Sequence, residues 1–386
     1  MDLRDTPEEA AWRQEVRAFI DKELPQRFKD EPMDSEEAAA LWGDPDMMAW
    51  RSKLAERGWI APSWPKEYGG AAFTLMQQFI MGEEMAEAYA PSVGGAGISM
   101  VGPTLIAHGT EEQKKEFLPK IASGELICTM AQLEPNGLFD ASGITVKATH
   151  KGDHYVLEGT KVFVEMANVA NYIICVARTD KGASADDGIT VFIVDAKSPG
   201  VHIEVIPTIG MDKLCEVQFK NVTVPQKNVL GKPDKGWHIV ENVMRRGSIA
   251  KCAESIGGMQ AAVDMTVAYS KERVQYDRPI GAFQALQHIM ADMWTAMQTS
   301  RYIVYQAAWM ESEGLPCTKE VAMAKAYVNE KYKWVTEKGV LLHGAIGTSR
   351  EHDIPLYFRR AKSADIRYGG TDFNREIVAK KIGLVS

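Results

Sequence analysis

The sequence has no excess of basic residues. Its 44 lysines and arginines are outnumbered by 52 aspartates and glutamates, which gives a formal net charge of −8 at pH 7. A protein that binds DNA or RNA neutralises phosphate groups with a basic face, so this acidic balance argues against that class. We therefore expect no nucleic acid among the partners of this protein.

Cysteine is scarce in a chain of 386 residues. The few cysteines are far apart, with no C-x-x-C pair and no histidine at the spacing of a zinc site. This pattern excludes a dense disulfide framework, predicts no metal site, and favours a reduced, cytoplasmic location. The cysteines are Cys128, Cys175, Cys215, Cys252 and Cys317.

Long apolar runs are also missing. No run approaches roughly 18 residues, the length of a membrane-spanning helix, so we expect no transmembrane segment. The first residues show neither the basic nor the apolar region of a secretory signal. Instead, Thr6, Pro7 and Glu9 form a capping box with proline at the first helical position, which predicts a helix through Ile20.

The residues that are present divide the chain into three regions of different periodicity. Apolar residues recur with helical spacing over 1–126, alternate as in strands over 127–232, and return to helical spacing over 233–386. Turn signals at 151–153 and 198–200 separate strands in the middle region. The pattern predicts an α+β fold with an N-terminal helical domain, a middle β-barrel or sandwich, and a C-terminal four-helix bundle.

Segments from all three regions carry one resemblance, in the right order and at the right separations. They lie at 58–70, 109–121, 273–284, 342–347, 351–362 and 368–371. Together they resemble the acyl-CoA dehydrogenases, and most of all the bacterial branch that acts on steroid-derived or other bulky CoA thioesters. The resemblance covers nearly the whole chain. It implies FAD as cofactor, an acyl-CoA as substrate, and electron-transfer flavoprotein as a candidate partner.

The catalytic base of that family is missing from both positions where relatives carry it. The reaction needs a carboxylate to remove the α-proton while the flavin N5 takes a hydride from the β-carbon. Relatives place this glutamate in the loop that here contains Gly369, or on the first helix of the bundle, where the register gives Gly247. Neither glycine can abstract a proton. Glu165 and Asp372 remain as candidates for an acid or base of different chemistry.

The half of the family's site that holds the flavin ring is altered as well. Leu133 and Phe139 replace a threonine and a serine that bind the ring in relatives, and a Trp-x-Thr segment becomes Phe163 to Glu165. At about 4 Å and an effective dielectric near 20, a carboxylate and an anionic reduced flavin repel by roughly 4 kcal/mol. We infer that this half-site holds no working flavin, unless Glu165 is protonated in an apolar setting.

The other half of the family's cofactor site, which a neighbouring subunit contributes, matches the family pattern more closely in this chain. In family dimers one subunit cradles the flavin ring, and the other supplies an arginine and a glutamine to the pyrophosphate and adenosine. Arg273 matches that arginine, whose planar fork of donors suits phosphate oxygens. The alternative is that Arg273 is only a surface charge at a helix end. The cofactor-binding candidates are Arg273, Gln275, Tyr276, Ile280, Phe283, Gln284, His343, Gly344 and Thr371.

This donated half has departures of its own. Leu341 replaces a glutamine of the family, Ala345 replaces a glycine, and the segment that begins at Thr371 is one residue short of the usual spacing. A pyrophosphate needs close approach of the backbone, which even a methyl group hinders. We therefore do not expect the adenosine contacts of this side to match those of the family.

The resemblance and its departures lead to one hypothesis and two rivals. The hypothesis is a non-catalytic subunit of a hetero-oligomeric α2β2 acyl-CoA dehydrogenase. It lends contacts to an FAD shared with a homologous subunit that carries the catalytic glutamate. One rival is a homomeric enzyme that performs a non-dehydrogenating step on a CoA thioester. The other is a flavin-free protein that binds or scaffolds an acyl-CoA.

Overall fold

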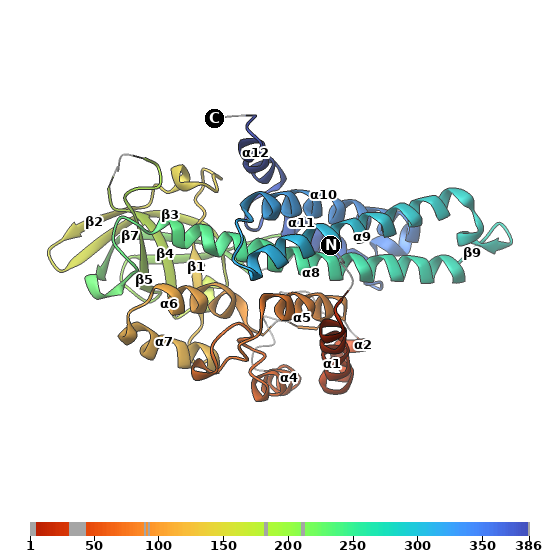
Figure 1. Cartoon of the computed structure of the whole chain (residues 1–386), viewed down its shortest axis with the longest axis horizontal. Helices are drawn as coiled ribbons and strands as arrows, with labels where there is room; N and C mark the ends of the chain where they lie inside the picture. Colours follow the sequence, from red (N-terminus) through yellow and green to blue (C-terminus); the bar gives the residue numbers. More distant parts are fainter. Residues whose placement is uncertain are drawn as a thin grey trace. The chain divides into compact units, whose positions relative to one another are not determined.

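The protein is built from two compact units, drawn in Figure 1. The computed structural model describes residues 5–30, 44–88, 90–91, 93–180, 184–209 and 213–384. Unit 1 combines the chain before residue 51, residues 73–91 and the chain from residue 248 onward. Unit 2 combines residues 51–72 and 92–247.

Helix α1 (Pro7–Glu23) opens unit 1 at the predicted capping box. The Thr6 N–H donates to Glu9 Oε2 at 2.8 Å, and the Glu9 N–H donates back to Thr6 Oγ1 at 3.2 Å. The predicted start of this helix is thus confirmed. Trp12 of α1 donates from Nε1 to the carbonyl of Gln77 at 2.9 Å, which fixes α1 against α5 (Leu75–Glu87).

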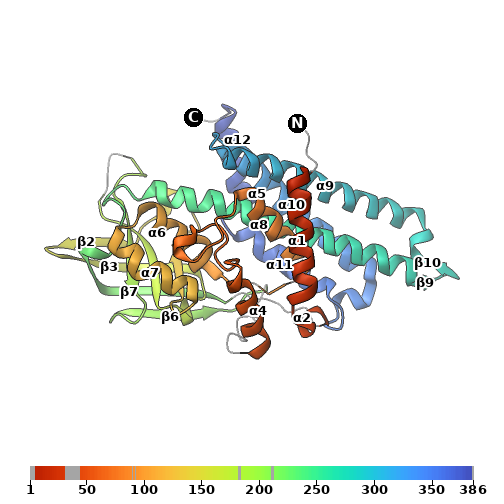
Figure 2. The same ribbon diagram turned by 60° about the horizontal axis from the view of Figure 1, so that its bottom comes forward.

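The rest of unit 1 is a helical bundle with one small hairpin. Its further elements are α2 (Gln26–Asp30), β9 (Val274–Gln275), β10 (Arg278–Pro279), α9 (Gln284–Ser312), α10 (Thr318–His343), α11 (Ile354–Ile366) and α12 (Thr371–Lys381). Two helices, α4 (Pro45–Glu56) and α8 (Trp237–Glu272), have residues in both units. Helices α9 and α10 run alongside the C-terminal part of α8 in both views (Figures 1 and 2), with the hairpin at the α8–α9 end.

Two adjacent glycines let α8 approach its neighbours closely. A Cβ atom on Gly257 would lie 2.4 Å from the carbonyl oxygen of Glu83 in α5. One on Gly258 would lie 2.2 Å from the hydroxyl of Tyr332 in α10. Because any larger residue would collide with these atoms, the glycine pair sets the spacing between α8 and two other helices of the bundle.

Unit 2 is organised around one eight-stranded sheet. Its strands follow the order β6-β7-β3-β2-β4-β5-β8, and β1 pairs in parallel with β4. The strands are β1 (Cys128–Ala131), β2 (Lys147–Lys151), β3 (His154–Glu165), β4 (Tyr172–Arg178), β5 (Ile189–Asp195), β6 (Val201–Ile206), β7 (Leu214–Pro225) and β8 (Val229–Leu230). Both turn signals of the sequence fall between consecutive strands, β2–β3 and β5–β6.

Helices α6 (Gly102–His108) and α7 (Glu111–Ser123) complete unit 2, preceded by a π-helical turn at Gly97–Val101. The fully buried Trp64 packs beside this turn, and its Nε1 donates to the carbonyl of Ile98 at 3.1 Å. The order of helices, sheet and helices along the chain confirms the predicted α+β fold. Within the described ranges, every helix is too short or too polar to cross a membrane.

Candidate cofactor site

The hairpin between α8 and α9 carries the first group of predicted cofactor residues. Val274 pairs with Pro279 and Gln275 with Arg278, so only two residues form the turn. These residues, Tyr276 and Asp277, have φ angles of 53° and 60°, the left-handed values that a type I′ turn requires. The tight turn leaves the Tyr276 side chain 87% exposed at the tip.

Contacts within the chain fix the base of this hairpin. The Ile280 N–H donates to the Arg273 carbonyl at 2.9 Å, and the Phe283 N–H donates to the Ile280 carbonyl at 3.1 Å. The Arg278 guanidinium lies 4.1 Å from the centre of the Phe283 ring, in cation–π geometry. Arg273, Gln275 and Gln284 are exposed around this base, so their polar groups face solvent. A phosphate group could reach the donors of Arg273 there.

His343 marks a second group of predicted residues, at the end of α10. Its ring stacks on Tyr269 with 4.5 Å between centroids, and the ring of His352 meets it edge-on at 4.5 Å. Nδ1 lies 2.7 Å from the Gly339 carbonyl, and since a carbonyl only accepts, Nδ1 carries the proton. Burial lowers the pKa of His343, so the ring is neutral at pH 7. Gly344 follows as the cap of α10 and is exposed.

The Nε2 atom of His343 is left as a buried acceptor without a hydrogen-bond partner among the described residues. The hairpin and this histidine are connected through Tyr269, because the Arg273 N–H donates to the Tyr269 carbonyl at 2.8 Å. Two groups that the sequence placed 70 residues apart therefore meet at one tyrosine. Solvent-facing donors such as those at the base of the hairpin suit the phosphate groups of a dinucleotide such as FAD.

Thr371, the last predicted cofactor residue, belongs to a different contact network. Its hydroxyl donates to Asp365 Oδ1 at 3.1 Å, and Asp365 Oδ2 accepts from Lys333 Nζ at 2.6 Å. Since a hydroxyl has a single proton, Thr371 has none left to donate to a ligand. The structure shows no contact that joins Thr371 to the hairpin among the residues described.

Gly369, one of the two expected base positions, sits in a buried turn before α12. Its φ of 94° is in the left-handed region, and the preceding Tyr368 has a φ of 58°. A Cβ atom on Gly369 would lie 2.4 Å from Cδ1 of Phe373. Asn374 Nδ2 donates to the carbonyls of Gly369 and Gly370, both at 3.0 Å, and holds the turn closed.

The second expected position of the base and the two substitute carboxylates lie on different elements. Gly247 is half-buried inside α8. Asp372 stands in the first turn of α12 with a side chain 93% exposed, 3.5 Å from Arg375. Glu165 is the half-buried last residue of β3, and its carbonyl accepts a hydrogen bond from Thr129 Oγ1 at 2.6 Å. Asp372 thus lies at the water-exposed start of α12.

The strand that ends at Glu165 is irregular where the family would hold the flavin ring. Its register with β7 shifts between Lys161 and Val164, and Phe163 has a φ of 54° in an exposed position. The Val162 N–H donates to the Leu133 carbonyl at 2.9 Å, which ties this bulge to the preceding loop. The substituted positions Leu133 and Phe163 therefore do lie on neighbouring segments of unit 2.

A buried ion pair between Lys161 and Glu134 holds the loop that follows Leu133. Lys161 Nζ lies 2.7 Å from Glu134 Oε1, and the two side chains are 0% and 2% exposed. Burial by itself raises the pKa of Glu134, but the charge of Lys161 and hydrogen bonds from Thr145 and Val146 hold it below its usual value. Glu134 is therefore an ionised structural anchor.

Family models match the chain in three consecutive stretches. The acyl-CoA dehydrogenase N-terminal domain matches residues 6–125, the middle domain residues 129–222, and the C-terminal domain residues 234–383. The chain belongs to the acyl-CoA dehydrogenase family. Members of this family are FAD-dependent oxidoreductases that act on the CH–CH bond of CoA thioesters.

Three similar proteins illustrate the range of this acyl-CoA dehydrogenase family. A probable acyl-CoA dehydrogenase of Bacillus subtilis is 32% identical, over 99% of this chain and 100% of its own. A caffeyl-CoA reductase–Etf complex subunit of Acetobacterium woodii is 32% identical over 94% of each chain. The solved structure named "Tcur3481-Tcur3483 steroid ACAD" is 26% identical, with a TM-score of 0.87 and full coverage of both chains.

Sequence patterns missed the residues of this family member that support the candidate cofactor residues. Tyr269 joins Arg273 to His343, and Lys333 and Asp365 hold Thr371. The contacts between Tyr269 and His343 and between Lys333 and Asp365 span more than two helical turns of sequence, so local periodicity carried no signal for them. Among the described residues, no group of three or more potential metal ligands comes together.

Proposed function

We propose that this chain is the base-free subunit of a hetero-oligomeric acyl-CoA dehydrogenase. The observation that carries the proposal is the turn at Gly369. Its φ of 94° is strained for any side chain, and the Phe373 ring occupies the space of a Cβ atom, 2.4 Å away. A glutamate at this position would strain the backbone and would require the Phe373 ring to move. The second family position, Gly247, also lacks a carboxylate.

In this proposal the chain lends contacts to an FAD whose ring is held by a homologous subunit with an intact glutamate. FAD, when bound, accepts the hydride from the β-carbon of the substrate. The residues of this chain would bind and orient its phosphate and adenosine end: Arg273, Gln275, Tyr276 and Gln284 from the hairpin, with His343 and Gly344 beside them. The exposure of the hairpin, 87% for Tyr276, supports a role toward a ligand held by another subunit.

Among the predicted cofactor-binding residues, Thr371 has the least support, because its hydroxyl already donates a hydrogen bond within the chain. Its hydroxyl proton is committed to Asp365, so it could meet the cofactor only as an acceptor. Ile280 and Phe283 serve by shaping the hairpin base, since the Ile280 N–H and the Phe283 ring hold Arg273 and Arg278 in place.

For the substrate we propose a bulky CoA thioester, with a steroid side chain as the leading case, and for the electron acceptor an electron-transfer flavoprotein. The similarity to a structure named as a steroid ACAD supports the first part. The similarity to a subunit of an Etf complex supports the second. Desaturation of such a thioester by the heteromer would be this chain's contribution to lipid metabolism.

The flavin content of the chain, purified alone and after co-expression with a homologue encoded beside it, tests the proposal. We expect a colourless protein alone, and an equimolar amount of FAD together with dehydrogenase activity in the heteromer. Turnover of an acyl-CoA by the chain alone would instead support a homomeric enzyme of altered chemistry. Absence of FAD from both preparations would support a flavin-free acyl-CoA-binding protein.

Replacing Arg273 by alanine should weaken FAD retention by the heteromer. We expect about a 10- to 100-fold higher dissociation constant, because a hydrogen bond to a charged group contributes about 1.5–3 kcal/mol. Flavin fluorescence on dilution measures this constant. Lys271→Ala is the matched control, since it removes an exposed positive charge near the end of the same helix. Equal effects of the two variants would mean that Arg273 acts only through general charge.

Restoring the glutamate at Gly369 should fail to restore activity in this chain. The Gly369→Glu variant must displace Phe373 and adopt a left-handed φ, so we expect a loss of about 1–3 kcal/mol in stability and no dehydrogenation without the partner. Thermal unfolding and an acyl-CoA oxidation assay measure the two effects. A Gly369→Glu chain that oxidises acyl-CoA by itself would contradict the proposed incapacity of this turn.

A further inference from the structure

Two histidines and a tyrosine meet where α10 ends and α11 begins. His343, the last residue of α10, stacks on Tyr269 of α8 with 4.5 Å between the ring centroids. The ring of His352, just before α11, meets His343 edge-on at 4.5 Å. The chain between the two histidines begins with the short helical turn Gly344–Thr348. Contact between the two histidine rings therefore closes this connection on itself.

His352 supplies the hydrogen bond that caps the start of α11. The N–H of Ile354, the first residue of the helix, donates to His352 Nδ1 at 3.1 Å. Among the described residues, the side chain of Asp353 at the N-cap position makes no capping hydrogen bond. Since a backbone N–H only donates, Nδ1 is the unprotonated nitrogen of His352. A further proton on this ring must go to Nδ1, where it would end the bond that caps the helix.

His343 resists a further proton for a different reason. Its Nδ1 already carries the proton that it donates to the Gly339 carbonyl, 2.7 Å away. The other nitrogen, Nε2, is buried and has no hydrogen-bond partner in the part of the chain that the structure describes. A cation at this position would lose its hydration without compensation, which is unfavourable. Protonation of His343 therefore requires that the packing around it opens.

The titratable groups around His343 do not remove this penalty. Burial lowers the pKa of His343, the Gly339 carbonyl raises it in part, and a charge on His352 lowers it further. Tyr269, from α8, brings a phenol that is neutral at pH 7. Burial raises the pKa of Asp353, and a charged His352 lowers it in part. Because two charged rings in contact repel each other, the two histidines cannot both hold an added proton while they stay packed.

We propose that His343 and His352 form a pH-sensitive latch, which keeps the turn Gly344–Thr348 closed while both rings are neutral and releases it when either is protonated. The inference goes beyond the proposed function, because it concerns this chain by itself. A consequence for the cofactor rests on that function. Gly344 lies in the released turn, and the carbonyl of Tyr269 accepts from the Arg273 N–H at 2.8 Å. Acid would thus loosen both groups of candidate cofactor residues.

Hydrogen exchange followed by mass spectrometry tests the latch on the purified chain. After correction for the intrinsic effect of pH on exchange, we expect the protected amides of residues 344–354 to lose about 10-fold or more in protection between pH 7.5 and pH 5.5. About 10-fold is the loss for each proton that only the open state takes up, because histidine ordinarily titrates near pH 6.5. The middle of α10 should keep its protection. Unchanged protection of residues 344–354 would overturn the inference.

Asparagine variants separate titration from packing. In His352→Asn the side-chain oxygen can still accept from the Ile354 N–H, and in His343→Asn the side-chain NH₂ can still donate to a carbonyl, but neither group titrates. We expect the double variant to lose the pH dependence of protection. His288→Asn, which removes an exposed histidine of α9 in the same unit, is the control and should retain it. An equal loss of protection in the double variant would mean that another group is responsible and would overturn the latch.

Release of FAD from the heteromer tests the consequence for the cofactor separately. We expect FAD to dissociate about 10-fold faster at pH 5.5 than at pH 7.5, and at equal rates in the double variant, as measured by flavin fluorescence on dilution. Equal rates in the wild type, with the latch shown to open, would contradict the proposed cofactor contacts and not the latch. The exchange experiment uses the chain alone, so its result stands even if the hetero-oligomer proves wrong.

Discussion

Replacing Arg13 by alanine is expected to destabilise unit 1 by up to about 3–5 kcal/mol, because it removes one of the cations that compensate two buried carboxylates. Arg13 donates to Asp5 Oδ2 at 2.7 Å, to Glu83 Oε2 at 2.8 Å, and to Glu84 Oε1 at 2.5 Å. Glu83 is 0% and Glu84 3% exposed. Burial opposes the charge of Arg13, but its acidic partners raise its pKa above the ordinary value, so it stays ionised at any practical pH.

The Arg13 network also holds the N-terminal helix in place. The Arg13 guanidinium donates to the Tyr305 hydroxyl of α9, and Arg301 of α9 pairs with the same Glu83. Loss of Arg13 should therefore loosen α1 from α5 and α9 before the rest of the unit unfolds. Urea unfolding measures the free energy, and limited proteolysis in α1 detects the loosening.

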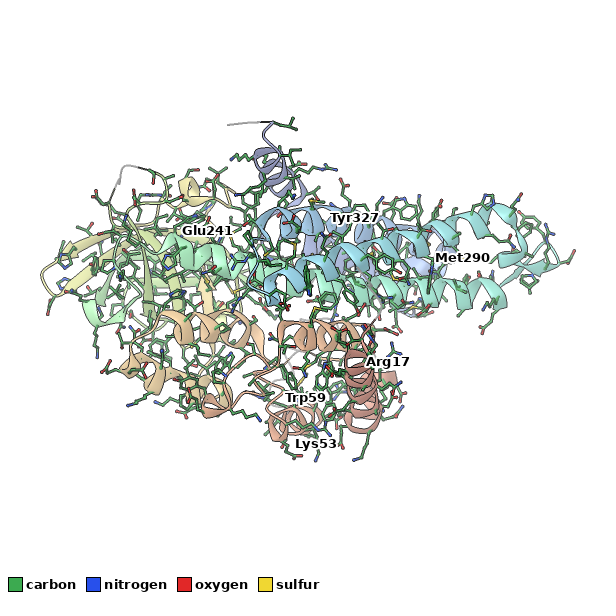
Figure 3. All side chains as sticks on the ribbon, viewed as in Figure 1. Arg17, Lys53, Trp59, Glu241, Met290 and Tyr327 are labelled. Atoms are coloured by element: carbon green, nitrogen blue, oxygen red, sulfur yellow. The ribbon has the colours of Figure 1, made fainter. Side chains whose placement is uncertain are left out.

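Arg17 provides the matched control for Arg13. It lies one turn further along α1, where Figure 3 labels it, and it also pairs with Glu84, but its side chain is 54% exposed. An exposed ion pair contributes about 0–1 kcal/mol, so Arg17→Ala should cost little. If both alanine variants lose less than about 1 kcal/mol, water reaches the carboxylates and the network does not stabilise the fold as described.

A second large effect is expected from Lys161→Met in unit 2, again about 3–5 kcal/mol. Lys161 Nζ donates to the Gln132 carbonyl at 2.9 Å and to Glu134 at 2.7 Å. Methionine fills the space of the lysine stem but leaves the Glu134 carboxylate buried beside two backbone N–H donors, those of Thr145 and Val146. Guanidinium unfolding at pH 7 measures the loss.

The pH dependence identifies the buried carboxylate as the cause of that loss. In the wild type the pKa of Glu134 is lowered, so its contribution is present above the unfolded pKa and fades as the pH falls through the folded one. Without Lys161, burial should raise that pKa instead, and the folded variant then gains stability as the pH falls. The deficit should therefore shrink between pH 7 and about pH 5.

Neutralising Glu134 in the variant gives the control. Adding Glu134→Gln to Lys161→Met removes the buried charge, so the double variant should recover part of the stability and lose the pH dependence. A deficit of equal size in the single and double variants, constant with pH, would mean that packing around Lys161 matters more than its charge.

Local sequence rules predicted the fold because its elements obey them. The capping box at Thr6 and the turn at Gly152 each act within a few residues, and each is found where it was expected. The alternation expected in residues 189–193 is not found, because β5 is buried on both faces. The three-part organisation with boundaries near residues 126 and 232 stays a prediction. The two compact units instead cut across it, because residues near both ends of the chain fold together.

The candidate site was predicted only in part, for a physical reason. Arg273 could be singled out because arginine at a helix end suits phosphate, but its connection to His343 through Tyr269 depends on packing between α8 and α10. Likewise, Gly369 could be identified as an expected base position from the resemblance to the family. That the Phe373 ring occupies the space of a side chain at this position can be seen only in the structure. Contacts made across the fold leave no periodic trace in the sequence.

The ring of Phe373 has a consequence for how this lineage can change. Glutamate codons differ from some glycine codons by a single base, so a glutamate could in principle arise at residue 369 in one mutational step. With Phe373 2.4 Å from the site of a new Cβ atom, that step first meets a steric penalty. A smaller residue at 373 would remove this penalty. If the chain works with a homologous, catalytically complete subunit as proposed, this steric penalty makes a return to independent catalysis at residue 369 difficult.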